Sequence, residues 1–185
     1  MAEKHISDFT KSPEQIVLDL INHDNSSTLT LELVSLGLPN VTVDNTNDRN
    51  TEVLVSSVKG GGYKGEVTVE YNRLQIQDFV PIMVEGGVLS LPVGDALRFS
   101  DMIPEINLAL GINLTEADYV DGDIGEWAGT PNEVKEIVIP MSADSLVYIG
   151  SLTLNLEAED IELASVITNM ILNGLNLPVA APIEP

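Results

Sequence analysis

The sequence predicts an α+β fold built from two tandem homologous modules, and an internal repeat is the main basis of that prediction. Residues 17–71 match residues 102–156 at a constant offset of 85 without a gap. Each copy opens with apolar residues at helical spacing and closes with alternating apolar residues on both sides of a turn. We expect each module to hold a helix, a short helix and an antiparallel β-hairpin or small sheet. A C-terminal helix and an extended tail follow the second module.

The repeat rests on residues that are identical in both copies and spread along them. Because the hydrophobic frame is kept while the acidic loops differ, we interpret the duplicated unit as a scaffold rather than a site. The identical pairs are Ile21/Ile106, Asn22/Asn107, Leu29/Leu114, Thr30/Thr115, Gly37/Gly122, Asn47/Asn132, Val53/Val138, Ser57/Ser142, Tyr63/Tyr148, Gly65/Gly150 and Thr68/Thr153.

The offset divides the chain into three parts. We expect a first module over residues 1–75, a second module with linker strands over residues 76–157, and a C-terminal helix with a Pro-rich tail over residues 158–185. Modules of this size bury little surface on their own. We therefore expect them to pack on each other or on neighbouring subunits.

Capping signals predict a long helix at the start of each module. Ser12 is a suitable N-cap, Pro13 suits the first helical position, and Gln15 stands where a capping box has its third helical residue. The counterpart in the second module covers residues 100–110, and Gly111 ends it.

A short helix is expected next in both copies. Thr30 and Thr115 are suitable N-caps, and Gly37 and Gly122 follow seven residues later, where such a helix would end. In the first copy, residues 31–34 could also form a strand on propensity alone. The Thr-to-Gly frame shared by both copies favours the helix.

The second half of each module predicts a β-hairpin. Residues 51–58 and 66–71 flank a turn at residues 60–62, and residues 136–139 are expected to pair with residues 151–156.

A repeated Tyr-x-Gly-x-(Val/Leu)-Thr motif marks the second strand of each hairpin. We expect the tyrosines to pack against the sheet and the glycines to permit a bulge or a close backbone approach, in preference to a ligand-binding role. The structural motif residues are Tyr63, Gly65, Thr68, Tyr148, Gly150 and Thr153.

The segments after the two modules have their own patterns. Residues 74–84 predict a strand in which Pro81 indicates an edge or a bend, residues 86–87 predict a turn, and residues 89–91 a short strand. Residues 157–173 predict an amphipathic helix. The apolar, proline-rich residues 177–185 cannot be helical, and they could either dock on a neighbour as an extended arm or form a frayed tail.

Charge and composition exclude several functions. The chain has 29 acidic and 8 basic residues, for a net charge of −21, so it cannot supply a basic surface for nucleic acid or for an anionic membrane. It has no cysteine, which excludes disulfides, zinc–thiolate sites and cysteine nucleophiles. Neither a secretion signal nor a bilayer-length apolar run is present, so we expect a protein made and kept in the cytoplasm unless an assembly carries it out.

Two acidic loops are weak candidates for calcium binding, because Ca²⁺ prefers carboxylate and carbonyl oxygens. Neither loop fits the EF-hand spacing, and ordinary turn chemistry explains them better, so we expect no metal and no cofactor. The weak metal candidates are Asp44, Asp48, Asp121, Asp123 and Glu126.

Catalytic signatures are missing from the sequence. It has no nucleophile-elbow, phosphate-loop or dinucleotide motif. The glycines at 60–62, although flanked by Lys59 and Lys64, lie in a predicted hairpin and not between a strand and a helix. Trp127 is expected to anchor a loop. We therefore expect no catalytic residues and no enzymatic activity.

Several segments resemble repeated modules in virion structural proteins of large tailed bacteriophages. In the second copy they are residues 107–115 (NLALGINLT), 120–122 (VDG) and 148–154 (YIGSLTL), and in the first copy 45–48 (NTND) and 63–74 (YKGEVTVEYNRL). The resemblance implies a structural component of a particle, with no catalytic residues to transfer.

The expected function is thus a non-enzymatic virion structural protein, multimeric and either capsid-decorating or part of the tail or its fibres. The expected partners are other virion proteins and further copies of itself, with no nucleic acid and no membrane, and the expected location is the virion, assembled in the host cytoplasm. The alternative is a calcium-dependent binding or adhesion module.

Overall fold

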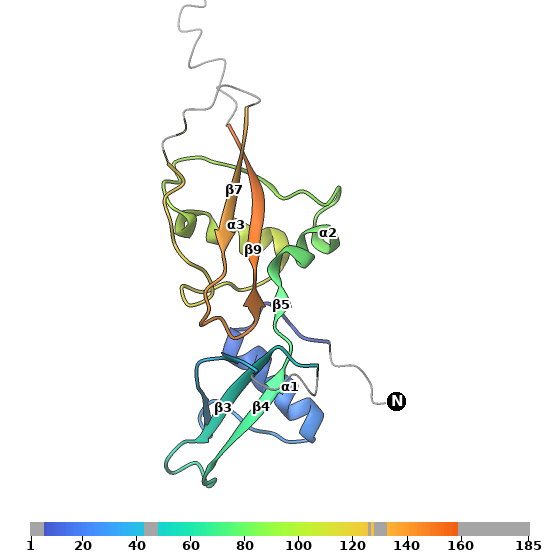
Figure 1. Cartoon of the computed structure of the whole chain (residues 1–185), viewed down its shortest axis with the longest axis vertical. Helices are drawn as coiled ribbons and strands as arrows, with labels where there is room; N and C mark the ends of the chain where they lie inside the picture. Colours follow the sequence, from blue (N-terminus) through green and yellow to red (C-terminus); the bar gives the residue numbers. More distant parts are fainter. Residues whose placement is uncertain (1–5, 43–47, 126, 128–132, 159–185) are drawn as a thin grey trace, which may run out of the picture.

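The computed structural model describes residues 6–42, 48–125, 127 and 133–158. The fold is mixed α+β, with a few helices and several small sheets. The molecule is elongated in Figure 1, with one helix–hairpin unit at each end. The first unit is α1 (Pro13–Asn25) with β3 (Thr51–Ser57) and β4 (Glu66–Tyr71), and the second is α3 (Phe99–Leu110) with β7 (Val134–Pro140) and β9 (Ser151–Glu157). The expected C-terminal helix and tail lie outside the described residues.

Both predicted long helices are confirmed. The Ser12 hydroxyl oxygen accepts a hydrogen bond from the Gln15 amide (3.3 Å), so Ser12 is the N-cap of α1. The helix ends at Ser26, which has a left-handed φ of 50°, and α3 ends in the same way at Gly111, with a φ of 62°.

The first sheet contains β1 (Val34–Leu36) and β2 (Asn40–Val41), both antiparallel to β3, which also pairs with β4. The predicted short helix is wrong in both copies, because a turn follows Thr30 and another follows Thr115. The Leu33 amide closes a turn onto the Thr30 carbonyl (2.9 Å), and the chain then enters β1. Pairing with β3 and burial of Val34 decide this conformation, so strand propensity was the better guide.

The second sheet confirms two predictions. β7 and β9 form the expected antiparallel hairpin, and the short strand expected at residues 89–91 is β6 (Ser90–Pro92). β6 pairs in parallel with the outer edge of β9, so β9 is the central strand of this sheet.

The segment between the two units, residues 74–93, is the linking segment. Its residues 76–83 are helical, so the strand predicted over residues 74–84 is wrong beyond Gln75. β5 (Leu74–Gln75) pairs in parallel with β8 (Tyr148–Ile149), and η2 (Ile76–Phe79) and α2 (Val80–Met83) follow. Pro81 lies in the first turn of α2, where its missing N–H costs nothing. Ile76 and Val80, four residues apart, are both fully buried, which is a helical rather than a strand pattern.

One hydrophobic core joins the two ends of the molecule. Ile16 and Val17 of α1 and Tyr71 of β4 belong to the same buried cluster as α3, β7 and β9. The linking segment contributes Ile76 and Val80 to it. The two helix–hairpin units therefore share one hydrophobic core.

The same pair of side-chain hydrogen bonds occurs in both helix–hairpin units. The Asn22 side chain accepts a hydrogen bond from the Leu29 amide (2.7 Å) and donates one to the Leu29 carbonyl (2.8 Å). Asn107 makes the same two bonds with Leu114, at 2.8 and 3.1 Å. In each case the asparagine fastens the end of the long helix to the turn that follows it.

The two hairpins differ in register by one residue. The Ser57 amide donates to the Gly65 carbonyl, and the Met141 amide donates to the Gly150 carbonyl, so β3 and β7 correspond at an offset of 84 while the glycines correspond at 85. Val53, which is fully buried, is therefore equivalent to buried Ile137 and not to the identical but half-exposed Val138.

Candidate functional site

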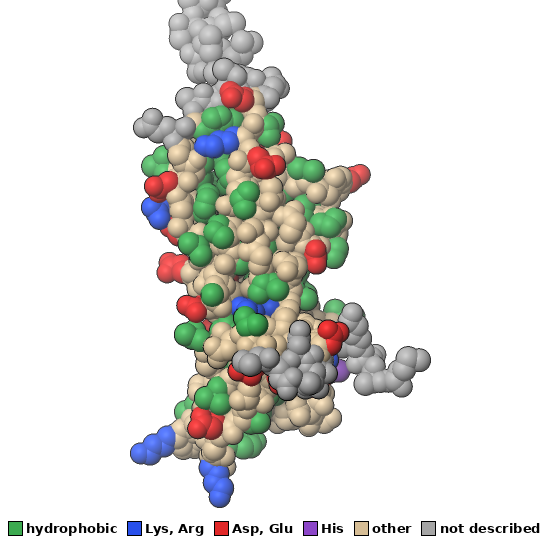
Figure 2. All heavy atoms as spheres, viewed as in Figure 1, with side chains coloured by type: hydrophobic (Ala, Val, Ile, Leu, Met, Phe, Trp, Pro, Cys, Tyr) green, Lys and Arg blue, Asp and Glu red, His purple; other side chains and the backbone are tan. Residues whose placement is uncertain are grey.

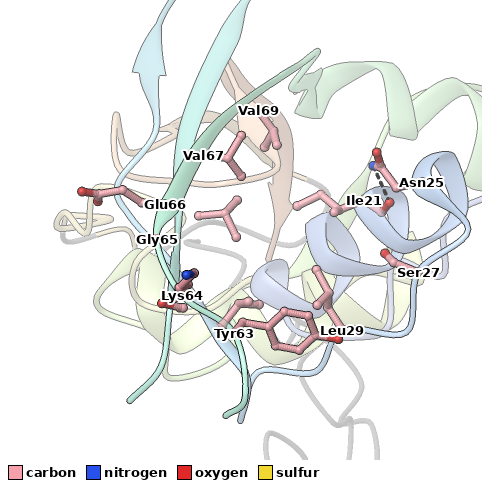
Figure 3. Close-up of a pocket in the computed structure, with 13 residues that line it drawn as sticks. Ile21, Asn25, Ser27, Leu29, Tyr63, Lys64, Gly65, Glu66, Val67 and Val69 are labelled. Atoms are coloured by element: carbon pink, nitrogen blue, oxygen red, sulfur yellow. Dashed lines mark hydrogen bonds between the residues drawn. The ribbon is translucent and has the colours of Figure 1, made fainter. Parts of the chain in front are cut away.

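An apolar groove lies between α1 and the β3–β4 hairpin, with a cavity volume of about 460 Å³. In Figure 3, Ile21 and Leu29 face the hairpin residues Tyr63, Val67 and Val69 across it. Val67 is 58% exposed and Tyr63 56% exposed, so an apolar strand face and an aromatic ring are left open to solvent. Burying such a surface against a partner is favourable.

The equivalent region at the other end of the molecule is filled. Ile106, Leu114 and Tyr148, the counterparts of Ile21, Leu29 and Tyr63, are all buried. The filling comes from the linking segment, because η2 contacts β9 and α2 contacts α3. The groove in the first half is thus an unfilled version of a packed core in the second half.

The two motif tyrosines have different surroundings. Tyr148 is fully buried, and its ring packs edge-on against Phe79 with the centroids 5.8 Å apart. Burial raises the pKa of Tyr148, and Asp118 adds to the shift. Tyr63 instead lies at the groove, because no segment described in the structure covers it as the linking segment covers Tyr148.

Both motif glycines have a φ that favours glycine, +90° at Gly65 and +84° at Gly150, while the bulge or close backbone approach expected at them stays a prediction. Their surroundings differ. A Cβ on Gly150 would overlap the Gln75 side chain, whereas a Cβ on Gly65 would meet nothing within 4 Å. The motif threonines also differ, because the Thr153 amide donates to Oε1 of Gln77 (2.7 Å), while Thr68 lies on the exposed edge strand β4.

A buried arginine ties the two halves together. Arg73 is 8% exposed, and its guanidinium donates to the Thr51 hydroxyl (2.8 Å) and to the carbonyls of Ala143 (3.0 Å) and Ser145 (2.9 Å). Burial lowers the pKa of the Arg73 guanidinium, which remains charged and anchors the loop that contains Ala143 and Ser145. Nothing in the local sequence signals this role.

A buried carboxylate completes the same junction. Asp118, 1% exposed, accepts bonds from the Ser145 hydroxyl (2.6 Å), the Thr115 hydroxyl (2.7 Å) and the Thr115 amide (2.9 Å). The Ser145 oxygen also accepts from the Tyr148 amide (3.1 Å). Ser145 and Asp118 thus hold the loop before β8 in place through these hydrogen bonds, so their role is structural.

Two of the weak metal candidates pair with a cation that the protein already supplies. The Arg98 guanidinium pairs with Asp121 (2.7 Å) and with Asp123 (2.9 Å). This bond lowers the pKa of Asp121 below its usual value. Asp48 is exposed, while Asp44 and Glu126 lie outside the described residues.

Metal-ligand clusters and membrane-spanning helices are both absent from the part of the chain that the structure describes. Within residues 6–42, 48–125, 127 and 133–158, no cluster of three or more metal-ligating side chains occurs. The helices in the same ranges include none with the length and apolar character to cross a membrane. Trp127 packs partly buried against the core, as expected for a loop anchor.

Comparison with known proteins places the chain in a family. The model of a family of unknown function, DUF7941, matches residues 6–182. The chain belongs to DUF7941. No curated protein and no solved structure matches it. The DUF7941 match covers both helix–hairpin units and the segment after β9.

Proposed function

We propose that this DUF7941 protein is a non-enzymatic virion structural protein of a bacteriophage, multimeric and either capsid-decorating or part of the tail or its fibres. The observation that carries the proposal is the open apolar groove beside an exposed strand edge, a surface suited to protein contacts. The strong negative charge keeps such a surface from collecting nucleic acid.

The polar chemistry of the described residues supports a structural role. Buried Arg73, Asp118 and Ser145 all bond within the fold, and exposed Asp121 is paired with Arg98. Side chains that are hydrogen-bonded within the fold in this way stabilise loops, and they are not free to transfer protons or to bind a reacting group. We therefore assign the protein no catalytic residue and no cofactor.

The architecture that we propose is a pair of tandem modules, residues 1–75 and 76–157, with residues 158–185 following. Support comes from the matching asparagine clasps of Asn22 and Asn107, the left-handed helix ends at Ser26 and Gly111, and the paired hairpins. Repeated modules of this kind present repeated surfaces, which suits a symmetric particle.

Mass spectrometry of purified particles of the phage that encodes the chain tests the proposal. We expect the protein in many copies per particle, at a ratio fixed across preparations. A phage protein needed only for replication, measured in the same sample, serves as the control for contamination. Detection in the infected-cell lysate but not in the particles would overturn the proposed function.

A further inference from the structure

The linking segment shows how a groove of this kind is filled. After β4, the chain pairs Leu74 with Tyr148 and Gln75 with Ile149, and β6 then adds to the outer edge of β9. Between these two strands, the Gln77 side chain accepts a hydrogen bond from the Thr153 amide. Residues 74–93 thus complete the helix–hairpin unit that follows them in the sequence.

The sequence of this linking segment recurs after β9. Leu89-Ser90-Leu91-Pro92-Val93 matches Leu175-Asn176-Leu177-Pro178-Val179 at an offset of 86 (175 − 89 = 86), and Ile76 matches Ile161 at 85 (161 − 76 = 85). Leu89, Leu91 and Ile76 are all buried in the linking segment. The C-terminal segment therefore carries the residues that fill a groove.

An empty place for such a segment exists in the first half. The linking segment lays Gln75 over Gly150, whereas the space over Gly65 is open. It also covers the counterpart of Val67, because Leu152 is fully buried. In the part of the chain that the structure describes, β4 pairs only with β3, so its outer edge has no neighbouring strand.

The direction of the chain indicates whose groove is filled. β9 runs toward the end of the molecule opposite the β3–β4 turn (Figure 1). The linking segment completes the unit that follows it, and β9 carries the chain away from the first unit of its own copy, so the first unit of another copy is the one that we expect it to reach. A donor segment passed in this sense makes a head-to-tail contact, which closes into a ring or extends as a filament.

We propose that residues 159–179 of one copy fill the apolar groove and extend the edge of β4 in a second copy, and so link subunits head to tail. This inference deepens the proposed function, because it names the contact that makes the protein multimeric. It is the strand-addition mode of recognition, with backbone bonds from the strand edge and side-chain specificity from the groove.

Charge complementarity supports placing residues 159–160 in the second copy as Leu74 and Gln75 are placed in the internal pairing. If residues 159–160 replace Leu74 and Gln75, Asp160 lies opposite Lys64, where the internal pairing has Gln75 opposite Ile149. Lys64 and Lys59 are both exposed, and Figure 2 shows basic side chains projecting at the end of the molecule that carries this turn. Glu162 takes the place of Gln77 as the acceptor for the Thr68 amide.

A mixing experiment with purified full-length protein tests the exchange. Leu177→Asp removes the donor, and Val67→Asp spoils the groove at a side chain that is already exposed. We expect wild type to form a series of multimers by light scattering, each variant alone to be monomeric, and a mixture of the two variants to form a dimer. Val41→Asp, on exposed β2, is the control and should assemble like wild type. A monomeric wild type, or a mixture without dimer, would overturn the proposal.

Cysteine cross-linking separates exchange between copies from folding back within one copy. Because the chain has no cysteine, every disulfide of the variant Asp160→Cys with Lys64→Cys joins introduced thiols, and peptide mapping distinguishes the designed 160–64 bond from 64–64 and 160–160 bonds. We expect oxidation to give a ladder of linked chains, while a control pair of Asp160→Cys with Glu105→Cys, on exposed α3, gives none. A cross-link confined to monomers would refute exchange between subunits. Either failure leaves the particle census to decide virion incorporation separately.

Discussion

At the scale of single residues, the junction between the two halves depends on a few buried polar groups. Asp118, Ser145 and Arg73 satisfy one another or loop carbonyls, and each would be costly to bury alone. Their bonding partners lie 27 and 72 residues apart in the sequence, so no local pattern predicts them.

Replacing Ser145 with Ala should lower the free energy of unfolding by roughly 2–3 kcal/mol, because it removes a donor to buried Asp118 and an acceptor for the Tyr148 amide. Urea denaturation measures the change. Ser142→Ala is the matched control, since its hydroxyl bonds an exposed amide, and it should cost less than about 0.5 kcal/mol. Equal losses in the two variants would contradict the role given to Ser145.

Replacing Tyr71 with Phe should change how stability depends on alkaline pH. Burial raises the pKa of Tyr71 to about 12 from 10.0, so the folded state favours the neutral phenol. Its contribution is complete below pH 10 and is lost as the pH rises through about 12. The variant should therefore lose stability less steeply over this window than wild type, with Tyr148 still contributing.

At neutral pH the Tyr71→Phe variant should be less stable by about 1–2 kcal/mol, because the buried Leu146 carbonyl loses the phenol donor at 2.6 Å. Denaturant titrations at neutral pH and at several values above pH 10 measure both effects. Parallel pH profiles for the variant and wild type would show that Tyr71 ionisation is not coupled to folding.

At the scale of elements, identical motifs in the two hairpins have different surroundings. Gly65 and Gly150 share a left-handed backbone, but only Gly150 has a side chain from the linking segment against it. Local sequence therefore could not predict which of the two glycines is covered.

Gly150→Ala should destabilise the fold more than Gly65→Ala. Both variants bear the backbone strain of a left-handed Ala, about 1–2 kcal/mol, and only the first must also displace Gln75. Thermal unfolding of both variants in a Leu177→Asp background compares them without the proposed subunit exchange. Equal losses would show that the linking segment does not press on Gly150.

The elements that sequence predicted well are those fixed by local chemistry. Ser12 begins α1, Gly111 ends α3, and both hairpins form with the expected antiparallel pairing. The errors lie where distant packing decides. Residues 31–36 became a turn and a strand because β3 pairs with them, and residues 76–83 became helical because Ile76 and Val80 reach the shared core. The groove could not be predicted, because its emptiness depends on the absence of a covering segment.

At the scale of the whole molecule, the net charge of −21 opposes compaction. Exposed acidic residues repel one another, and added salt screens that repulsion over a Debye length of about 10 Å at 0.1 M. We expect the melting temperature to rise from low salt to roughly 0.5 M sodium chloride, as measured by scanning calorimetry.

Calcium and magnesium should raise the melting temperature equally at matched ionic strength. Arg98 already holds Asp121 and Asp123, so screening is the expected effect of both ions. A rise specific to calcium at low concentration, reversed by EDTA, would contradict this and favour the calcium-dependent binding alternative.

The one-residue difference in hairpin register constrains how the two halves can be recombined. From Val34 to its partner Ser57 the chain advances 23 residues, and from Tyr119 to Met141 it advances 22, while the following turns to Gly65 and Gly150 differ in the opposite sense. The two length changes cancel, which is why the sequences align without a gap. A chimera that exchanged β3 for β7 by sequence identity would turn every side chain of that strand to the wrong face. Crossovers at the asparagine clasp and at the motif glycine transfer both changes together and keep the core facing inward.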